Sequence, residues 1–357
     1  MPVYCIAFAL SMIMAAVFCH GSLANKKSAL VWLPVMPILL VSVFRYGIGT
    51  DYLGVYDFGY ESVVLGRVWN YSRFEPGYIA INFLVYFLHG TSFWVFAIMA
   101  VIFHYFMYRF ILDWSENVPL SLLVLFVSQQ WLFSLSAIRQ AAAIALVVFS
   151  IKYVCQKKPL KYLFFISLAA SLHFMALVFV PLYWLFRRRY SQCAVLFCSL
   201  FVLAISYLSP SFFQSVAGLF NRQDYFDSAY YKGRLYYVEF AFAFLFTVVL
   251  MLMQSKNSDF DKKYEVLINV AIFGLFAASA SALIPNAERF DMFFTATYIV
   301  LIPAVAKSCK TQLSMFALTV LLVSSLGARL VYDTYFNGDG NGIAEYHCIF
   351  FDENGRI

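Results

Sequence analysis

Long apolar runs alternate with short polar intervals along the whole chain. Thirteen such runs lie at residues 3–19, 29–44, 76–88, 92–112, 118–135, 137–155, 160–171, 173–186, 192–208, 236–253, 265–284, 291–306 and 311–331. A helix needs about 20 apolar residues to cross a bilayer, and several runs are shorter than that. The pattern therefore predicts an all-α polytopic integral membrane protein with roughly 12–14 transmembrane helices, some of them re-entrant or broken. We expect residues 1–357 to form a single transmembrane domain.

Composition supports the same class of protein. Hydrophobic residues make up 63% of the chain and charged residues only 12%, which excludes a soluble domain. The net charge of +6 is spread over short loops between apolar runs, so it does not indicate a nucleic-acid partner. The seven cysteines form no C-x-x-C pair, and no spacing of histidines and carboxylates suggests a metal. We expect no cofactor, and a first helix that is retained and not cleaved as a signal peptide.

The polar intervals fall into two kinds. Short basic intervals contain Lys26–Lys27, Lys157–Lys161, Arg187–Arg189, Lys256–Lys263 and Lys307–Lys310, whereas intervals 45–75, 209–234, 285–290 and 332–357 mix charges with aromatic residues. Basic loops concentrate on the cytoplasmic side of membrane proteins, so we expect the second kind outside. From residue 137 onward, successive membrane crossings place every polar interval on its expected side of the membrane. Before residue 137, the number of apolar runs does not allow this. Either one helix boundary is wrong or 76–88 is re-entrant or interfacial, and we favour the second because this run spans only about 20 Å as a helix.

The segment Arg45-Tyr-Gly-Ile-Gly-Thr-Asp-Tyr52 interrupts two apolar blocks and concentrates chemically useful groups. Gly47 and Gly49 let the backbone turn sharply and present its N–H groups. A guanidinium beside these amides and the Asp51 carboxylate suits a ligand that carries phosphate and sugar. The alternative is a membrane-interface turn capped by aromatic residues such as Tyr52.

Two further positions carry polar groups that are costly inside an apolar chain. Arg139 opens an alanine-rich helix next to Gln140 and two serines, where a guanidinium costs roughly 2.5–3.5 kcal/mol if it lies within the bilayer. It should therefore face a partner or a wet cavity at a broken helix joint, unless it snorkels to the interface. His173 lies between two short apolar runs. Its possible roles are a general base, a substrate ligand, or a hydrogen-bonded residue at a helix joint.

The remaining candidates lie on the same expected side of the membrane. Glu75 precedes Pro76, where it acts in the site or is stabilised by a helix N-terminus. Arg234 closes the interval 209–234, and Arg289 begins a late helix. Arginines are unusual on the side of the membrane opposite the basic loops. Binding of an anionic lipid headgroup would explain their presence there. We therefore expect 45–75 and 209–234 to cap a membrane cavity.

The order of these motifs resembles that of the EpsG family of Wzy-type polysaccharide polymerases, over nearly the whole chain. The resemblance is carried by Arg45 to Tyr52, Glu75-Pro-Gly77, Ser136-Ala-Ile-Arg-Gln140, Ser171-Leu-His-Phe174 and Glu288-Arg-Phe290. The first and third motifs are specific in combination, and the others are common local strings.

The resemblance implies a GT-C-like enzyme of the bacterial inner membrane that works on the periplasmic face. It would transfer the growing glycan from one undecaprenyl diphosphate to the incoming lipid-linked repeat unit, without a metal. On that chemistry Arg45, Arg139 and Arg289 would bind the diphosphate, with Gly47, Gly49, Tyr52, Gln140 and Arg234 around the substrate. His173 would be the base, with Glu75 or Asp51 as substitutes. A chain-length regulator and a flippase are implied partners, beside the lipid bilayer.

Other functions share parts of this pattern. An O-antigen ligase performs the same donor chemistry on another acceptor, and a flippase or solute transporter needs intramembrane polar groups but no base. No internal repeat of the kind common in transporters is visible in the sequence. The sequence does not distinguish O-antigen from capsule or exopolysaccharide, nor retaining from inverting chemistry, and it fixes neither the sugar linkage nor the oligomeric state.

Overall fold

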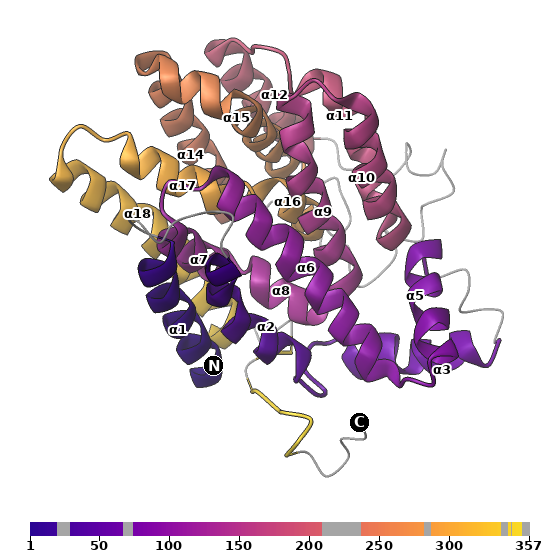
Figure 1. Cartoon of the computed structure of the whole chain (residues 1–357). Coiled ribbons are helices and arrows are strands. Elements are labelled where there is room, and N and C mark those ends of the chain that lie inside the picture. Colours follow the sequence, from indigo (N-terminus) through magenta and orange to yellow (C-terminus); the bar gives the residue numbers. More distant parts are fainter. Residues whose placement is uncertain are drawn as a thin grey trace. The chain divides into compact units, whose positions relative to one another are not determined.

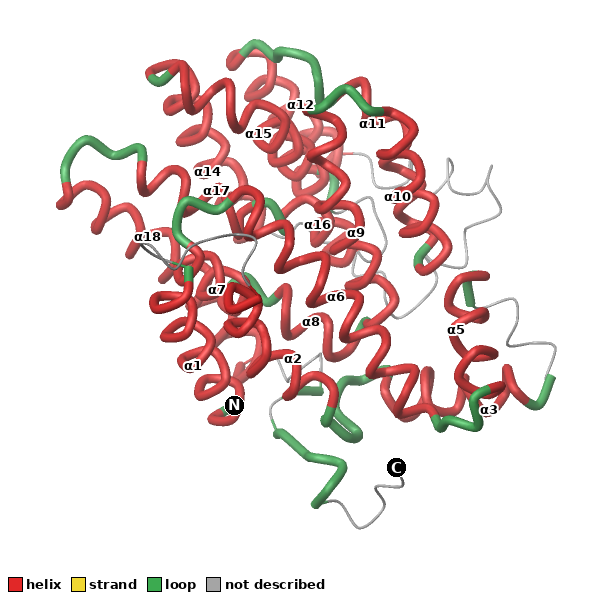
Figure 2. The backbone as a smooth tube through the Cα atoms, viewed as in Figure 1, coloured by secondary structure: helices red, strands yellow, loops and turns green. Residues whose placement is uncertain are grey.

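The computed structural model describes residues 1–19, 29–66, 74–208, 237–281, 287–336, 342–343 and 345–351, without the side chain of Glu288. Helices make up nearly all of this part of the chain, and it contains no strand (Figure 2). The all-helical class predicted from the apolar runs is confirmed, since each of the thirteen runs coincides with a helix or a pair of helices. The sole β-type pairing among the described residues is one isolated bridge between Arg45 and Cys348.

The described helices form two compact units, residues 1–180 with 302–357 and residues 181–301. Unit 1 contains α1 (Pro2–Phe18), η2 (Ala29–Val35), α2 (Met36–Val43), η3 (Tyr52–Asp57), α3 (Phe58–Val64), α5 (Pro76–Phe87), α6 (Ser92–Trp114), α7 (Val118–Val127), α8 (Gln130–Ser136), α9 (Ile138–Cys155), α10 (Pro159–Leu172), η4 (Phe174–Val178), α18 (Gln312–Val331) and η6 (Tyr332–Phe336). Unit 2 contains α12 (Gln192–Leu208), α14 (Tyr237–Lys256), α15 (Ser258–Ser279) and α16 (Ala287–Thr295). The helices α11 (Phe179–Leu185) and α17 (Tyr298–Lys307) join the units. The organisation as a single transmembrane domain stays a prediction.

In the described part of the chain, five helices are long and apolar enough to span a membrane, or six if the bent pair α7–α8 counts as one span. Six more apolar helices in the described part of the chain have 10–17 residues, among them α5 with 12. A helix of 12 residues covers only about 18 Å, which is too short to cross the bilayer. This length agrees with the expectation that 76–88 is a re-entrant or interfacial segment. The chain is therefore a polytopic membrane protein.

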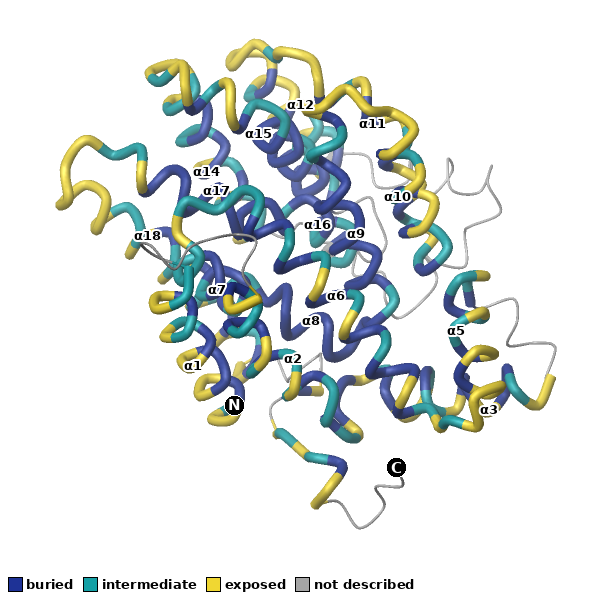
Figure 3. The backbone as a smooth tube through the Cα atoms, in the orientation of Figure 1, coloured by how far each residue is buried: buried dark blue, intermediate teal, exposed yellow. Residues whose placement is uncertain are grey.

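Helix α9 is the centre of unit 1. It packs between α6 and α10, which run beside it in Figure 1, and almost its whole length is buried in Figure 3. Its interior begins with Ala141, Ala142 and Ala143, and these small side chains let neighbouring helices approach closely. Helix α10 returns antiparallel after the basic turn at Lys157, so the end of α10 lies at the start of α9.

Local sequence explains where the helices of unit 1 begin and bend. Pro76 and Pro159 occupy the first positions of α5 and α10, where a missing N–H costs nothing. The bend of 52° between α7 and α8 occurs at Gln129, which has a left-handed φ of 64°. The Gln129 amide donates to Asp333 in η6 at 2.7 Å, which fastens the bend to the end of α18.

Unit 2 is organised around α15. Its Asn257 caps the helix by accepting two backbone N–H groups, and Asn269 donates to the carbonyls of Phe186 and Arg188, both at 2.8 Å. A Cβ on Gly274 would lie 2.9 Å from Phe294, so this glycine lets α15 and α16 come together. These contacts fix the helix that carries Arg289.

The described residues 45–66 of the expected cap 45–75 are largely helical. They contain the π-helix η3 followed by α3, because Tyr52, Tyr56 and Tyr60 recur at a spacing of four and bury one face. Single π-turns are frequent at functional sites. The second expected cap, 209–234, lies outside the described residues.

Candidate functional site

Three of the residues singled out in the sequence meet at one carboxylate. Oε2 of Glu75 accepts a hydrogen bond from Nη1 of Arg139. Oε1 of Glu75 lies 3.2 Å from Nδ1 of His173 and accepts the backbone N–H of Phe174 at 3.1 Å. Both carboxylate oxygens are therefore engaged, and Arg139 has the partner that a guanidinium at the start of an apolar helix requires. We call Glu75, Arg139 and His173 the charged triad.

The triad forms because three helix ends converge. Glu75 immediately precedes α5, Arg139 is the second residue of α9, and His173 is the extended residue between α10 and η4. Gly77 lets α5 reach α10, since a Cβ at this position would lie 2.8 Å from the carbonyl oxygen of Ser171. The second, third and fourth sequence motifs are therefore brought together, and His173 is a helix-joint residue as expected.

Aromatic rings surround the Arg139 guanidinium. Its carbon Cζ lies 4.9 Å from the ring centre of Phe74, 5.5 Å from that of Tyr78 and 5.7 Å from that of Tyr56. Ring faces attract cations most strongly where water is excluded, and these three side chains are buried. We call them the aromatic cage. The cage was not predicted from the sequence. The spacing of four between Tyr52 and Tyr56 was a usable signal, because it places both rings on one face of a helix.

The surroundings of Glu75 favour its ionised form. Glu75 lies outside the five candidate spans, and burial alone would raise its pKa. The contact with the His173 imidazole, the charge of Arg139 and the Phe174 N–H outweigh burial, so the pKa of Glu75 lies below its usual range. A carboxylate held in this way is a poor proton acceptor and a good orienting group.

Arg45 is buried in a different environment. Its side chain is 1% exposed, Nη1 donates to the carbonyl of Ser42, and Cζ lies 5.8 Å and 5.4 Å from the rings of Tyr52 and Phe96. Neither Nε nor Nη2 has a hydrogen-bond partner in the described part of the chain. Burial lowers the pKa of Arg45 to about 10, which leaves it charged at neutral pH.

A hydrogen-bonded group of three side chains lies next to Arg45. Nδ1 of His104 lies 2.7 Å from the carbonyl of Ala100 and must donate to it, which leaves Nε2 as an acceptor. Trp131 Nε1 donates to this Nε2 at 3.0 Å and to Oγ of Ser42 at 3.1 Å. His104 therefore ties α6 to α2 and α8 as a neutral imidazole.

The C-terminal segment completes the first motif. The Tyr46 N–H donates to the His347 carbonyl and the Ile349 N–H donates to the Phe44 carbonyl, both at 3.0 Å. This short antiparallel pairing runs past Arg45. Nothing in the plain sequence of 341–357 indicated it, because main-chain hydrogen bonds need no particular side chains.

The first motif also packs directly on the joint between α8 and α9. Gly49 has a φ of +100°, and a Cβ there would lie 2.5 Å from the Leu135 carbonyl oxygen. Thr50 Oγ1 and Ser136 Oγ form a hydrogen bond of 2.9 Å across the same contact. Gly47, with a φ of +65°, has open space around it and serves the turn alone. The predicted break near Ser136 is therefore the place where the two most specific motifs meet.

One layer of rings connects the guanidinium of the buried Arg45 with that of the half-buried Arg139. Tyr52 stacks on Phe96 with centroids 3.9 Å apart, and Phe96 meets Tyr56 edge to face at 6.2 Å. Arg45 contacts the layer at Tyr52 and Phe96, and Arg139 contacts it at Tyr56. The two guanidinia therefore contact neighbouring rings of one packed layer.

The other predicted site residues do not belong to the charged triad. Asp51 is half-buried at the start of η3, where its carbonyl accepts the Tyr56 N–H, and Gln140 is buried in α9. Arg289 lies in α16 of unit 2, a different unit from the triad. Arg234 lies outside the described residues. The roles proposed for these residues stay predictions.

Comparison with known proteins identifies the family. The sequence model of the EpsG family matches residues 28–347, nearly the whole chain. The chain belongs to the EpsG family. This is a family of Wzy-like polysaccharide polymerases, so a polymerase role of the glycosyltransferase type follows for the chain in general terms. Neither the curated proteins nor the solved structures that were searched contain a match.

The EpsG-family match covers all five motifs of the sequence analysis, and four of them converge in unit 1. No group of three or more histidine, cysteine or carboxylate side chains suited to a metal occurs among the described residues. The charged triad, the aromatic cage and the buried Arg45 therefore make up the candidate site of this EpsG-family protein.

Proposed function

We propose that this protein polymerises oligosaccharide repeat units carried on undecaprenyl diphosphate, at the periplasmic face of the bacterial inner membrane. The products would be O-antigen, capsule or exopolysaccharide chains. The EpsG-family match supports the polymerase class. The single observation that carries the finer proposal is the charged triad, a carboxylate held between a guanidinium and an imidazole in an apolar bundle.

The position of the triad supports an active site on the side opposite the basic loops. Arg139 is at the start of α9, and Lys152 is near its end, about 20 Å further along the helix. The neighbouring turn carries Lys157 and Lys158, which the positive-inside rule assigns to the cytoplasm. The triad then faces the periplasm, where lipid-linked repeat units are polymerised in this proposal.

In the proposed reaction, His173 is the general base. Its Nδ1 faces Glu75, so the carboxylate favours the tautomer with hydrogen on Nδ1 and leaves the lone pair on Nε2. Nε2 has no partner within the described ranges. The acceptor hydroxyl would give its proton to Nε2 while its oxygen bonds to the anomeric carbon of the donor. The bond from that carbon to the diphosphate oxygen breaks, and undecaprenyl diphosphate leaves with the electron pair.

Arg139 is the proposed ligand of the leaving diphosphate. Negative charge grows on the diphosphate as it departs, and a positioned guanidinium that binds the charge more tightly at that stage lowers the barrier. A guanidinium carries five N–H donors, so Arg139 can keep Glu75 while it binds a phosphate oxygen. The aromatic cage holds the cation without neutralising it, and no metal takes part in this proposal.

The structure supports different roles for the substitutes named from sequence. Glu75 is engaged at both oxygens and has a lowered pKa, so we propose that it positions His173 and Arg139 and does not serve as the base. Arg45 is fully buried, and we propose that it supports the site through the ring layer; as a direct diphosphate ligand it would first have to become exposed. Arg289, Arg234, Gly47, Gly49, Tyr52, Gln140 and Asp51 remain proposed parts of the substrate site.

The alternatives are an O-antigen ligase and a flippase or transporter, and the lipid-linked oligosaccharides of cells lacking the gene distinguish them. A missing polymerase leaves surface glycans with single repeat units and no long chains. Absence of all surface glycan, or accumulation of complete long chains on the carrier lipid, would contradict the proposal. Restoring the gene restores long chains only if the protein itself was responsible.

A further inference from the structure

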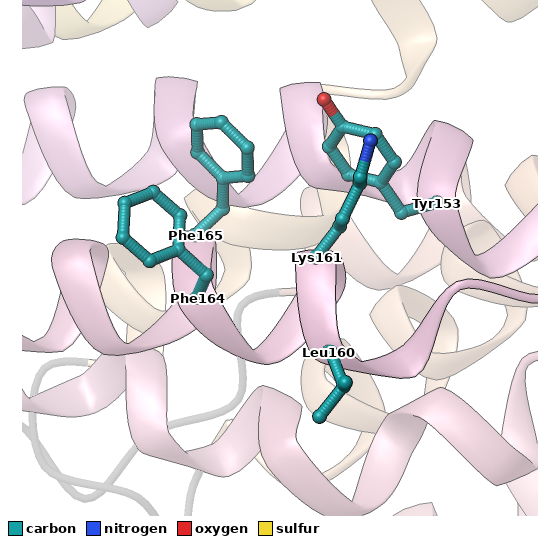
Figure 4. A pocket seen from close by; sticks show the side chains of 5 residues that line it. All are labelled: Tyr153, Leu160, Lys161, Phe164 and Phe165. Carbon is teal, nitrogen blue, oxygen red and sulfur yellow. The ribbon is translucent and has the colours of Figure 1, made fainter.

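A groove opens between the end of α9 and the start of α10, at the end of unit 1 opposite the charged triad. Tyr153, Leu160, Lys161, Phe164 and Phe165 line it (Figure 4). The rings of Tyr153 and Phe165 stack with centroids 5.5 Å apart. Leu160 and Phe164 are 81% and 63% exposed, so the groove offers an open apolar surface beside one ammonium group.

The charges around this groove are not balanced within the described part of the chain. Two other lysines of unit 1 have carboxylate partners: Lys152 donates to Asp113 at 3.1 Å and Lys307 donates to Glu116 at 2.6 Å. Lys157, Lys158 and Lys161 form no ion pair with any described residue, and Lys158 donates only to the Gln156 amide oxygen. Three ammonium groups within five residues therefore adjoin an apolar groove.

We propose that this groove binds an anionic phospholipid of the surrounding bilayer. The phosphate of the headgroup would lie against Lys161 and the neighbouring lysines, and an acyl chain would lie along Phe164 and Leu160. Each lysine near a membrane surface strengthens the attraction of anionic lipid by about 1 kcal/mol. The site is separate from the proposed active site and does not depend on the polymerase activity.

Native mass spectrometry of the full-length protein tests this site, with phosphatidylglycerol and phosphatidylcholine supplied at equal concentration. We expect the protein to retain phosphatidylglycerol in preference to phosphatidylcholine. The double substitution Lys158→Gln with Lys161→Gln should weaken phosphatidylglycerol binding by about fivefold for each lysine removed. Phe164→Ser should weaken the binding of both lipids at the groove, because it removes the apolar wall.

Lys310→Gln is the control for a lysine outside the groove, since it removes one positive charge from another basic turn, where the double variant removes two. Phosphatidylglycerol binding that is unchanged in Lys310→Gln and reduced in the double variant supports the site. Equal retention of the two lipids by the parent protein would overturn the proposal, and so would equal losses in the control and the double variant. Displacement of the lipid by millimolar inorganic phosphate would assign the lysines to a phosphate site and overturn the lipid assignment. Thermal unfolding in detergent confirms that each variant is folded.

Discussion

At the scale of single residues, the proposed function depends on how a few charges are held in an apolar bundle. Glu75 satisfies Arg139 and faces His173, so each member of the charged triad limits the orientation of the others. Arg45 has rings around it and no carboxylate partner among the described residues. The two guanidinia should therefore respond differently to substitution.

Arg139→Lys tests the shape of the cation. An ammonium keeps the charge but reproduces neither the planar contact with the aromatic cage nor two parallel hydrogen bonds to an anion. We expect chain polymerisation to fall by at least tenfold at normal protein abundance, measured by glycan length in complemented cells. Chain lengths near those of the parent would reduce Arg139 to a structural anchor.

Glu75→Gln tests the electrostatic link within the triad. Because the folded-state pKa of Glu75 is lowered, the ionised carboxylate stabilises the fold above the unfolded-state pKa of about 4.3. That contribution is lost as the pH falls through the folded-state pKa. The melting temperature of the parent in detergent should therefore exceed that of Glu75→Gln at pH 7 by a margin that shrinks below pH 4. A margin independent of pH would show that ionisation of Glu75 is irrelevant to stability.

At the scale of elements, the site depends on close approaches between helix ends. Gly49 touches the joint of α8 and α9, and Gly77 touches the end of α10. The helices themselves could be predicted from the apolar runs. A long apolar segment inside a bilayer finds no water for its backbone N–H and C=O groups, and a helix pairs these groups within the segment. Which helix ends meet depends on contacts between backbone atoms, and those leave little trace in a single sequence.

Gly49→Ala and Gly47→Ala form a matched pair for this point. Both glycines have a positive φ, so alanine costs about 1 kcal/mol of backbone strain at either position. Only at Gly49 does the new methyl group also collide with the Leu135 carbonyl, which should raise the total cost to about 4 kcal/mol. Thermal stability and polymer length should both fall more for Gly49→Ala. Equal effects would indicate that this contact is looser than the structure shows.

At the scale of the whole molecule, the sequence predicted the class of fold and singled out the three residues of the charged triad, but not the contacts that surround them. The breaks at Ser136 and His173 were expected from serines and a histidine inside apolar runs, and both occur. The aromatic cage was missed because tyrosines are equally frequent at membrane interfaces. The pairing of Arg45 with the C-terminal segment was missed because it uses main-chain atoms alone.

Topology is the prediction that belongs to this scale. Single cysteines introduced into a cysteine-free protein should be labelled from the periplasm at Asp51 and at Phe212, and from the cytoplasm at Lys157 and at Arg188. The positive-inside rule predicts this arrangement, because it assigns the basic intervals to the cytoplasmic side. Labelling of position 51 only from the cytoplasm would move the charged triad to the wrong face for the proposed reaction.

The most direct test of the account is polymerisation by the purified protein with defined undecaprenyl-diphosphate-linked repeat units. The parent protein should produce a ladder of longer lipid-linked glycans and release undecaprenyl diphosphate. His173→Gln keeps the size and much of the hydrogen bonding but cannot take the proton, so it should lose about 10²–10⁴-fold in rate while binding of the donor alone is unchanged. Repeat units that remain unextended by the parent protein would contradict the central claim. A ladder formed by His173→Gln within a few-fold of the parent rate would still support the polymerase function but would exclude His173 as the general base.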